Sequence, residues 1–204
     1  MLQIGVLALQ GGVHEHLDAV RGAADKAKIP ISLRTVRTAR ELEGLQGLLM
    51  PGGESTTMSL LLQKNSMLEP TRNIPGLFGT CAGLILMAKE VEGKMQGQEG
   101  LDVMDVGVSR NAYGAQIDSF ESVLESEILP KMRIPFIRAP KITKVDEAAG
   151  VRILARLPKS NEPVIVEQRM PGRFYLGATC HPEIRTTRVH EYFLRALAAA
   201  LKSA

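Results

Sequence analysis

The chain has 204 residues, of which 45% are apolar, so it can bury a sizeable core, and we expect one domain over residues 1–204. The net charge of +3 comes from 25 basic and 22 acidic residues mixed along the sequence, which argues against a nucleic acid or a membrane as partner. The apolar N-terminal run is too short for a membrane span and lacks a signal peptide's basic flank, and two cysteines make no disulfide framework, so we expect a cytoplasmic protein.

The first half of the sequence predicts strands that alternate with helices. A continuous apolar run predicts a strand at residues 4–9, and further strands are predicted at residues 31–36, 48–50 and 77–78. Apolar residues at helical spacing lie between these runs, and the segment 82–91 is apolar enough to form a largely buried helix. This alternation predicts an α/β fold with three layers, in which helices cover both faces of a mostly parallel open sheet.

The second half is organised differently. Short strands are predicted at residues 103–108, 135–138, 151–155, 164–168 and 174–180. They indicate a mixed, partly antiparallel sheet, while polar, glycine-rich residues 92–100 indicate a loop. Apolar residues at helical spacing between Val189 and Leu201 predict a C-terminal helix packed on the sheet.

Cys81 is the candidate nucleophile. It stands in the pattern Gly79-Thr80-Cys81-Ala82-Gly83, between an apolar strand and a helix, which is the context of a nucleophile elbow. The glycines allow close approach of strand and helix, and a helix N-terminus favours the thiolate. An isolated cysteine is more commonly a small buried hydrophobe, and we assign that role to Cys180 because adjacent strand residues point to opposite faces. A single disulfide bond between the two cysteines remains an alternative.

His181 and Glu183 are the candidate base and its orienting acid. They follow the last predicted strand, and a spacing of two in extended backbone places both side chains on one side, with Pro182 fixing the geometry. A thiolate, a histidine and a carboxylate complete the arrangement of nucleophile, base and orienter. His-Pro-Glu alone is a short motif that also arises by chance. His14, His16 and His190 are assigned solvated or partly packed roles, and no Cys/His cluster has zinc-like spacing, so no metal is expected.

The turn after the third strand is the candidate oxyanion loop. Gly52 and Gly53 free the backbone to present a peptide N–H to a negative oxygen, with the N–H of Ala82 as second donor. A purely structural turn with Ser55 as helix N-cap is the alternative. No Walker or dinucleotide-binding pattern is complete. Arg110 and Arg138 each follow an apolar run, from which either could reach a carboxylate.

The sequence resembles the triad-type, class I glutamine amidotransferases, and within them the glutaminase subunits of pyridoxal 5′-phosphate synthase. The resemblance spans nearly the whole chain. Its motifs are Leu9-Gln10-Gly11-Gly12, Pro51-Gly52-Gly53-Glu54-Ser55-Thr56-Thr57-Met58, Gly79-Thr80-Cys81-Ala82-Gly83, Arg110-Asn111-Ala112-Tyr113-Gly114, Asp118-Ser119-Phe120-Glu121, Ile137-Arg138-Ala139-Pro140 and His181-Pro182-Glu183. Departures are Ala115, in place of a basic residue, and Ile184, in place of leucine. Residues 125–135 and 159–163 match poorly, as expected of surface loops.

The resemblance implies a mechanism, a substrate and a partner. It implies a triad of Cys81, His181 and Glu183 that hydrolyses L-glutamine through a thioester, without a cofactor. The residues that it implies for glutamine binding are Gly53, Glu54, Ser55, Arg110, Ile137 and Arg138. It also implies a hetero-oligomeric complex with a synthase (lyase) subunit. That subunit receives the ammonia and makes pyridoxal 5′-phosphate, which is thus a product of the complex and not a cofactor of this chain.

Three other interpretations remain to be tested. A glutaminase subunit could serve another synthase, such as the one that builds the imidazole ring of histidine, although the Gly-Glu-Ser-Thr-Thr and Ile-Arg-Ala-Pro segments argue against it. A γ-glutamyl peptidase would share the elbow and would act on folate polyglutamate. A scaffold that binds the synthase without catalysis would leave Cys81 unlabelled by a glutamine-analogue electrophile.

Overall fold

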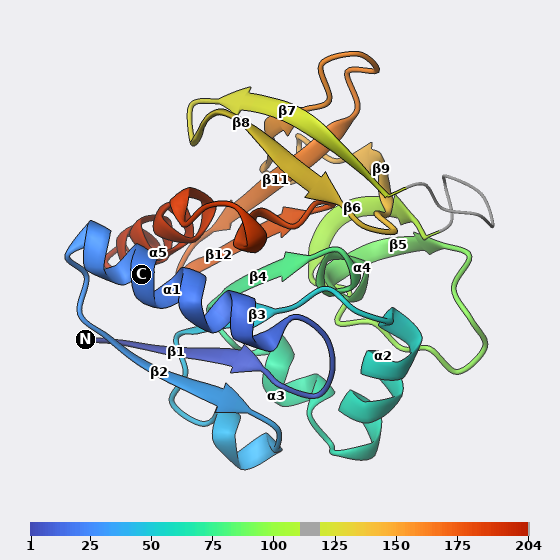
Figure 1. Cartoon of the computed structure of the whole chain (residues 1–204). Helices are drawn as coiled ribbons and strands as arrows, with labels where there is room; N and C mark the ends of the chain where they lie inside the picture. Colours follow the sequence, from blue (N-terminus) through green and yellow to red (C-terminus); the bar gives the residue numbers. More distant parts are fainter. Residues whose placement is uncertain (111–118, 204) are drawn as a thin grey trace.

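A seven-stranded sheet forms the centre of the molecule (Figure 1), in a computed structural model that describes residues 1–110 and 119–203. Its strand order is β10-β11-β12-β4-β3-β1-β2. The bounds are β1 Leu2–Leu7, β2 Ile31–Val36, β3 Gly47–Met50, β4 Gly76–Thr80, β10 Val151–Arg156, β11 Pro163–Met170 and β12 Arg173–Ala178. The strands from β12 to β2 pair in parallel, whereas β10 and β11 pair antiparallel. The predicted, mostly parallel sheet with an antiparallel part is therefore confirmed.

Helices cover both faces of this sheet because successive strand residues point to opposite sides. Leu49 and Phe78 face one hydrophobic core, which α1 (Val13–Ala27) and α5 (Arg188–Ala200) complete. Leu48 and Leu77 face the other core, to which α2 (Ser55–Lys64), α3 (Leu68–Arg72) and α4 (Ala82–Met87) contribute. Figure 1 shows α1 and α5 side by side over the first face. The three predicted layers and the C-terminal helix are thus confirmed.

Two small sheets are added to this frame. One has the order β5-β6-β9, with bounds Ala88–Glu92, Met104–Ser109 and Lys141–Val145, and the other is the hairpin of β7 (Phe120–Ser126) and β8 (Leu129–Phe136). A short 3₁₀ helix, η1, spans Ala39–Leu42. The prediction of one helix over residues 82–91 is wrong, because the chain becomes extended at Ala88 and pairs with β6. The loop expected at residues 125–135 is also wrong, since most of it lies in the hairpin.

The topology gathers the candidate residues at one edge of the main sheet. β3 is followed by the Gly52 loop, β4 by Cys81 and β12 by His181, and these three strands are neighbours in parallel register. The carboxyl ends of adjacent parallel strands are where open α/β sheets bind ligands. Within the described part of the chain, no helix is long and apolar enough to cross a membrane.

Candidate active site

Cys81 lies on a strained elbow between β4 and α4. Its φ of 49° and ψ of −105° are unusual for a residue with a side chain, and its backbone N–H donates to Ala178 O of β12 at 2.8 Å. The two glycines of the motif are sterically required. A Cβ at Gly79 would lie 2.4 Å from the carbonyl carbon of Gly83, and a Cβ at Gly83 would lie 2.1 Å from Met50 O. The predicted nucleophile elbow is therefore present.

His181 and Glu183 form a close pair beside Cys81. His181 Nδ1 lies 2.7 Å from Glu183 Oε1, and the exposed fractions of the two side chains are only 12% and 2%. The two side chains are close together as predicted, but the prediction that the backbone between them is extended is wrong. Pro182–Ile184 forms a 3₁₀ turn, η2, and a hydrogen bond from His181 N to Pro135 O at 3.0 Å anchors that turn to β8.

The electrostatics of the pair favour a charged imidazole. Burial alone would lower the pKa of His181. Hydrogen bonding to Cys81 and to Glu183 outweighs burial and raises this pKa to about 10. His181 is therefore protonated at neutral pH and carries a proton beside the sulfur. Cys180, by contrast, is fully buried in a hydrophobic core, and this burial raises the pKa of its thiol, as expected for an inert cysteine. Both cysteines are free thiols.

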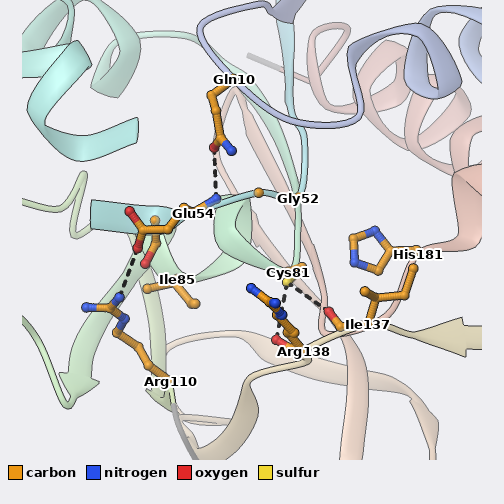
Figure 2. A pocket seen from close by; sticks show the side chains of 11 residues that line it. Gln10, Gly52, Glu54, Cys81, Ile85, Arg110, Ile137, Arg138 and His181 are labelled. Atoms are coloured by element: carbon orange, nitrogen blue, oxygen red, sulfur yellow. Dashed lines mark hydrogen bonds and ion pairs between the residues drawn. The ribbon is translucent and has the colours of Figure 1, made fainter. Parts of the chain in front are cut away.

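Two carbonyl groups face the nucleophile from below in Figure 2. Cys81 Sγ lies 3.7 Å from Ile137 O and 3.7 Å from Arg138 O, so its S–H has acceptors on the segment that follows β8. Arg138 itself has a φ of 47°. Carbonyl oxygens accept from a thiol and repel a thiolate. This contact therefore places two electron-rich oxygens directly beside the candidate nucleophile.

The glycine loop after β3 lies directly against the pair. A Cβ at Gly52 would lie 2.3 Å from His181 Cε1 and 3.2 Å from Cys81 Cβ. Gly52 O accepts from Gly12 N at 3.3 Å, and in a trans peptide the following N–H, that of Gly53, points the opposite way, away from Gly12. Ala82 opens α4, where a backbone N–H has no partner within its helix. The two candidate oxyanion donors, the N–H groups of Gly53 and Ala82, thus belong to the turns on either side of Cys81.

These groups line a cavity of about 650 Å³. Its lining residues are Gln10, Gly52, Gly53, Glu54, Ser55, Cys81, Ile85, Arg110, Ile137, Arg138 and His181. Figure 2 shows Cys81 between His181 on one side and the pair of Glu54 and Arg110 on the other. Every residue expected to bind glutamine lies on this cavity. The Asn111 to Gly114 motif, Ala115 and Asp118 lie outside the described residues.

Glu54 and Arg110 hold each other at the far side of the cavity. Arg110 donates to Glu54 Oε1 at 3.2 Å, and also to Gln98 Oε1 at 2.6 Å. Burial alone would raise the pKa of Glu54. Hydrogen bonds from the backbone N–H groups of Thr56 and Thr57 outweigh burial and lower this pKa to about 2. Glu54 is also the N-cap of α2 through these bonds, so the assignment of Ser55 as N-cap is wrong. A guanidinium held in this way is suited to a ligand carboxylate.

Two residues of the cavity were not singled out as site residues from the sequence. Gln10 accepts a hydrogen bond from Glu54 N at 2.8 Å, which ties the loop after β1 to the loop after β3. Its place directly after the first parallel strand was the available signal. Ile85 lies one helical turn after Cys81, and this spacing alone places it beside the nucleophile.

His16 and His190 are completely buried, so the expected solvated or partly packed roles are wrong for both. Their ring nitrogens meet, with His16 Nδ1 at 3.0 Å from His190 Nε2, while His14 is exposed as expected. Burial lowers the pKa of each buried histidine to about 3, and the nearby Glu183 carboxylate offsets only part of this effect for His16. Both imidazoles are therefore neutral at physiological pH.

The buried histidines predict a loss of stability in mild acid. Below about pH 6.5 the two imidazoles take up protons in the unfolded state but not in the folded state, so the free energy of unfolding falls by up to roughly 2.7 kcal/mol per pH unit. His181 adds no slope there, because it is protonated in both states. Urea denaturation at pH 5 and pH 6 measures the effect. His190→Gln should halve the slope, and the exposed His14→Gln should leave it unchanged. An equal slope in wild type and His190→Gln would contradict the prediction.

Comparisons with known proteins find glutamine amidotransferases and PdxT subunits that match nearly the whole chain. A family model described as the SNO glutamine amidotransferase family matches residues 6–199. The pyridoxal 5′-phosphate synthase subunit PdxT of Thermococcus onnurineus (strain NA1) is 43% identical over 204 residues, covering 96% of this chain and 98% of that protein. The protein of the same name from Corynebacterium jeikeium (strain K411) is 46% identical over 198 residues, covering 94% and 95%. A crystal structure of a glutamine amidotransferase matches with a TM-score of 0.79 and 40% identity, covering 96% of this chain and 98% of that one.

Proposed function

Since the chain belongs to the SNO glutamine amidotransferase family, we propose that it hydrolyses the side-chain amide of L-glutamine to L-glutamate and ammonia, with Cys81, His181 and Glu183 as its catalytic triad. The observation that carries this proposal is the elbow cysteine beside a histidine whose Nδ1 is 2.7 Å from a buried carboxylate. Residues 1–204 act as one glutaminase domain, because all three groups come from loops of a single sheet.

The chemistry proceeds through two half-reactions. In the first, the Cys81 thiolate attacks the amide carbon, a tetrahedral intermediate forms, and the C–N bond breaks as charged His181 gives its proton to the departing nitrogen, which leaves as ammonia. In the second, neutral His181 takes a proton from water, the hydroxide attacks the thioester, and the C–S bond breaks. This step releases glutamate, whose new carboxyl loses its proton to solvent, and restores the thiolate beside charged His181. Glu183 holds the imidazole in the tautomer that both steps need and stabilises its charged form.

Backbone groups stabilise the negative oxygen of each intermediate. We assign this role to the N–H of Ala82 and to the Gly52-Gly53 turn, both beside Cys81. The α-carboxylate of glutamine pairs with Arg110, whose guanidinium Glu54 and Gln98 already orient. Gly53, Ser55, Ile137 and Arg138 complete the walls of the glutamine site.

The ammonia is delivered to a synthase subunit in a hetero-oligomeric complex of the cytoplasm. Two relatives that cover nearly the whole chain are named as subunits of pyridoxal 5′-phosphate synthase, which supports this partner and makes pyridoxal 5′-phosphate the product of the complex. The resting contact of Cys81 Sγ with two carbonyl oxygens supports a further point. The subunit alone is held back, and docking of the synthase, together with glutamine, moves these carbonyls away from the sulfur.

Glutamate production with and without the synthase subunit tests the proposal. We expect hydrolysis to be at least about 10²-fold faster in the complex, the size of effect associated with one oxyanion donor. Folate polyglutamate is the matched substrate, and its cleavage in preference to glutamine would favour a γ-glutamyl peptidase. If neither preparation forms glutamate faster than a protein-free blank, the proposal is wrong.

A further inference from the structure

A pair of buried histidines lies directly behind the triad. His16 Nε2, from α1, is 3.0 Å from Thr80 Oγ1 and 3.6 Å from Glu183 Oε1. Thr80 immediately precedes Cys81, and Glu183 Oε1 is the oxygen that binds His181 Nδ1. One imidazole therefore contacts both the strand that carries the nucleophile and the carboxylate that orients the base.

The hydrogen-bonding pattern assigns the proton of His16. Its Nδ1 meets His190 Nε2 at 3.0 Å, and His190 Nδ1 has no partner among the residues described. If His190 carried its proton on Nδ1, a donor would be buried without an acceptor, which is rare in proteins. Placing the proton on His190 Nε2 avoids this cost and makes His16 Nδ1 the acceptor. His16 then carries its own proton on Nε2, the nitrogen that faces Glu183 and Thr80.

The carboxylate of Glu183 faces two imidazoles. Glu183 Oε2 is buried and, in residues 1–110 and 119–203, has no hydrogen-bond partner, so Oε1 makes the recorded contacts. Oε1 lies 2.7 Å from Nδ1 of charged His181 and 3.6 Å from Nε2 of neutral His16, and the second distance is beyond a hydrogen bond. The N–H of His16 therefore adds an electrostatic contact, not a hydrogen bond, to the oxygen that binds His181.

We propose that His16 is a positioning residue of the triad, whose Nε2–H donates to Thr80 Oγ1 and faces Glu183 Oε1 at 3.6 Å, and whose own tautomer is set by His190. The inference rests on the proposed function and adds a fourth group to its machinery. The rings of Phe78 and His16 pack in a T-shaped contact, with the centroids 5.9 Å apart at 86°. Two helices and a strand therefore hold the imidazole rigidly, as outer-shell partners of catalytic groups must be.

The groups that face Glu183 are neutral His16 from α1, charged His181, and the inert thiol of Cys180 after β12, with His190 of α5 acting through His16. The partial positive charge of an N–H attracts a nearby carboxylate oxygen. Removing the N–H of His16 should therefore loosen the placement of Glu183 against His181 and lower kcat without changing KM. A merely structural role would instead lower stability.

Replacements at one position separate positioning from packing. In His16→Gln the side-chain amide reaches the place of Nε2, whereas in His16→Asn it reaches only that of Nδ1. In the complex with the synthase, we expect His16→Asn to lower kcat about 10- to 100-fold at unchanged KM for glutamine, by analogy with outer-shell partners of metal-bound histidines. His16→Gln should stay close to wild type in kcat. Val20→Ala, a buried change on the same helix, controls for lost stability.

Three outcomes decide the matter. If wild type is active and His16→Asn matches Val20→Ala in kcat and KM, the inference fails while the proposed function stands. If wild type is inactive in the complex, the proposed function fails and the inference fails with it. ¹⁵N NMR of the histidine rings reads the tautomer independently of activity, and a proton found on Nδ1 of His16 overturns the inference.

Discussion

Cys81→Ala is expected to lower glutamine hydrolysis in the complex by at least about 10⁴-fold, because no other group near the cavity can form the thioester. Alanine is smaller than cysteine and tolerates the elbow no worse, so the folded structure should persist. Glutamate formation measures the activity, and circular dichroism and the midpoint of thermal unfolding measure the fold.

Cys180→Ala is the matched control for this result. Cys180 is fully buried, so its truncation should lower the free energy of unfolding by about 1–2 kcal/mol while turnover remains near that of wild type. The role of Cys81 is refuted if Cys81→Ala retains turnover with the synthase present. Loss of activity in Cys180→Ala at unchanged stability would instead point to the wrong cysteine.

Glu183→Gln should cost about 10⁴-fold in kcat, the effect of the equivalent amide substitution in a serine protease triad. The amide matches the carboxylate in shape but can present its N–H₂ to His181 Nδ1, which favours the wrong tautomer and removes the charge that stabilises the imidazolium. Steady-state kinetics with the synthase subunit measure the loss in kcat.

Glu90→Gln provides the comparison for a carboxylate outside the cavity. Glu90 forms an exposed ion pair with Lys144 at 2.5 Å, and such pairs contribute little. Its kcat should equal that of wild type. A Glu183→Gln enzyme with kcat within about tenfold of wild type would show that His181 does not need the carboxylate, and that the triad reduces to a dyad.

Most of the parallel core was predictable because β1, β3 and β4 are rich in apolar residues and lie close to glycines. β2 was predicted at its observed bounds, and β1, β3 and β4 within about two residues. The segment after Met87 was not predictable in this way. Its residues favour a helix locally, but pairing with β6 decides their conformation, and such long-range contacts leave no periodic pattern. β7 was missed for a similar reason, since a half-exposed hairpin carries only a weak alternation.

In the candidate site, too, features that depend on local sequence were predictable, whereas contacts between distant elements were not. The residues of the proposed triad were singled out from two short motifs, although the backbone between His181 and Glu183 is a 3₁₀ turn and not extended. The burial of His16 had a local signal, because His16 is four residues before the buried Val20 and thus lies on the same helix face. Its contact with Glu183 joins α1 to η2 and had no such signal.

The adjacency of β4 and β12 has a consequence for the order of biosynthesis. Cys81 and His181 are 100 positions apart, so at 5–20 residues per second a ribosome finishes the nucleophile roughly 5–20 s before the base. The bond from Cys81 N to Ala178 O also cannot form until β12 has been translated. The elbow around Cys81 is therefore complete only when a late strand inserts beside an early one.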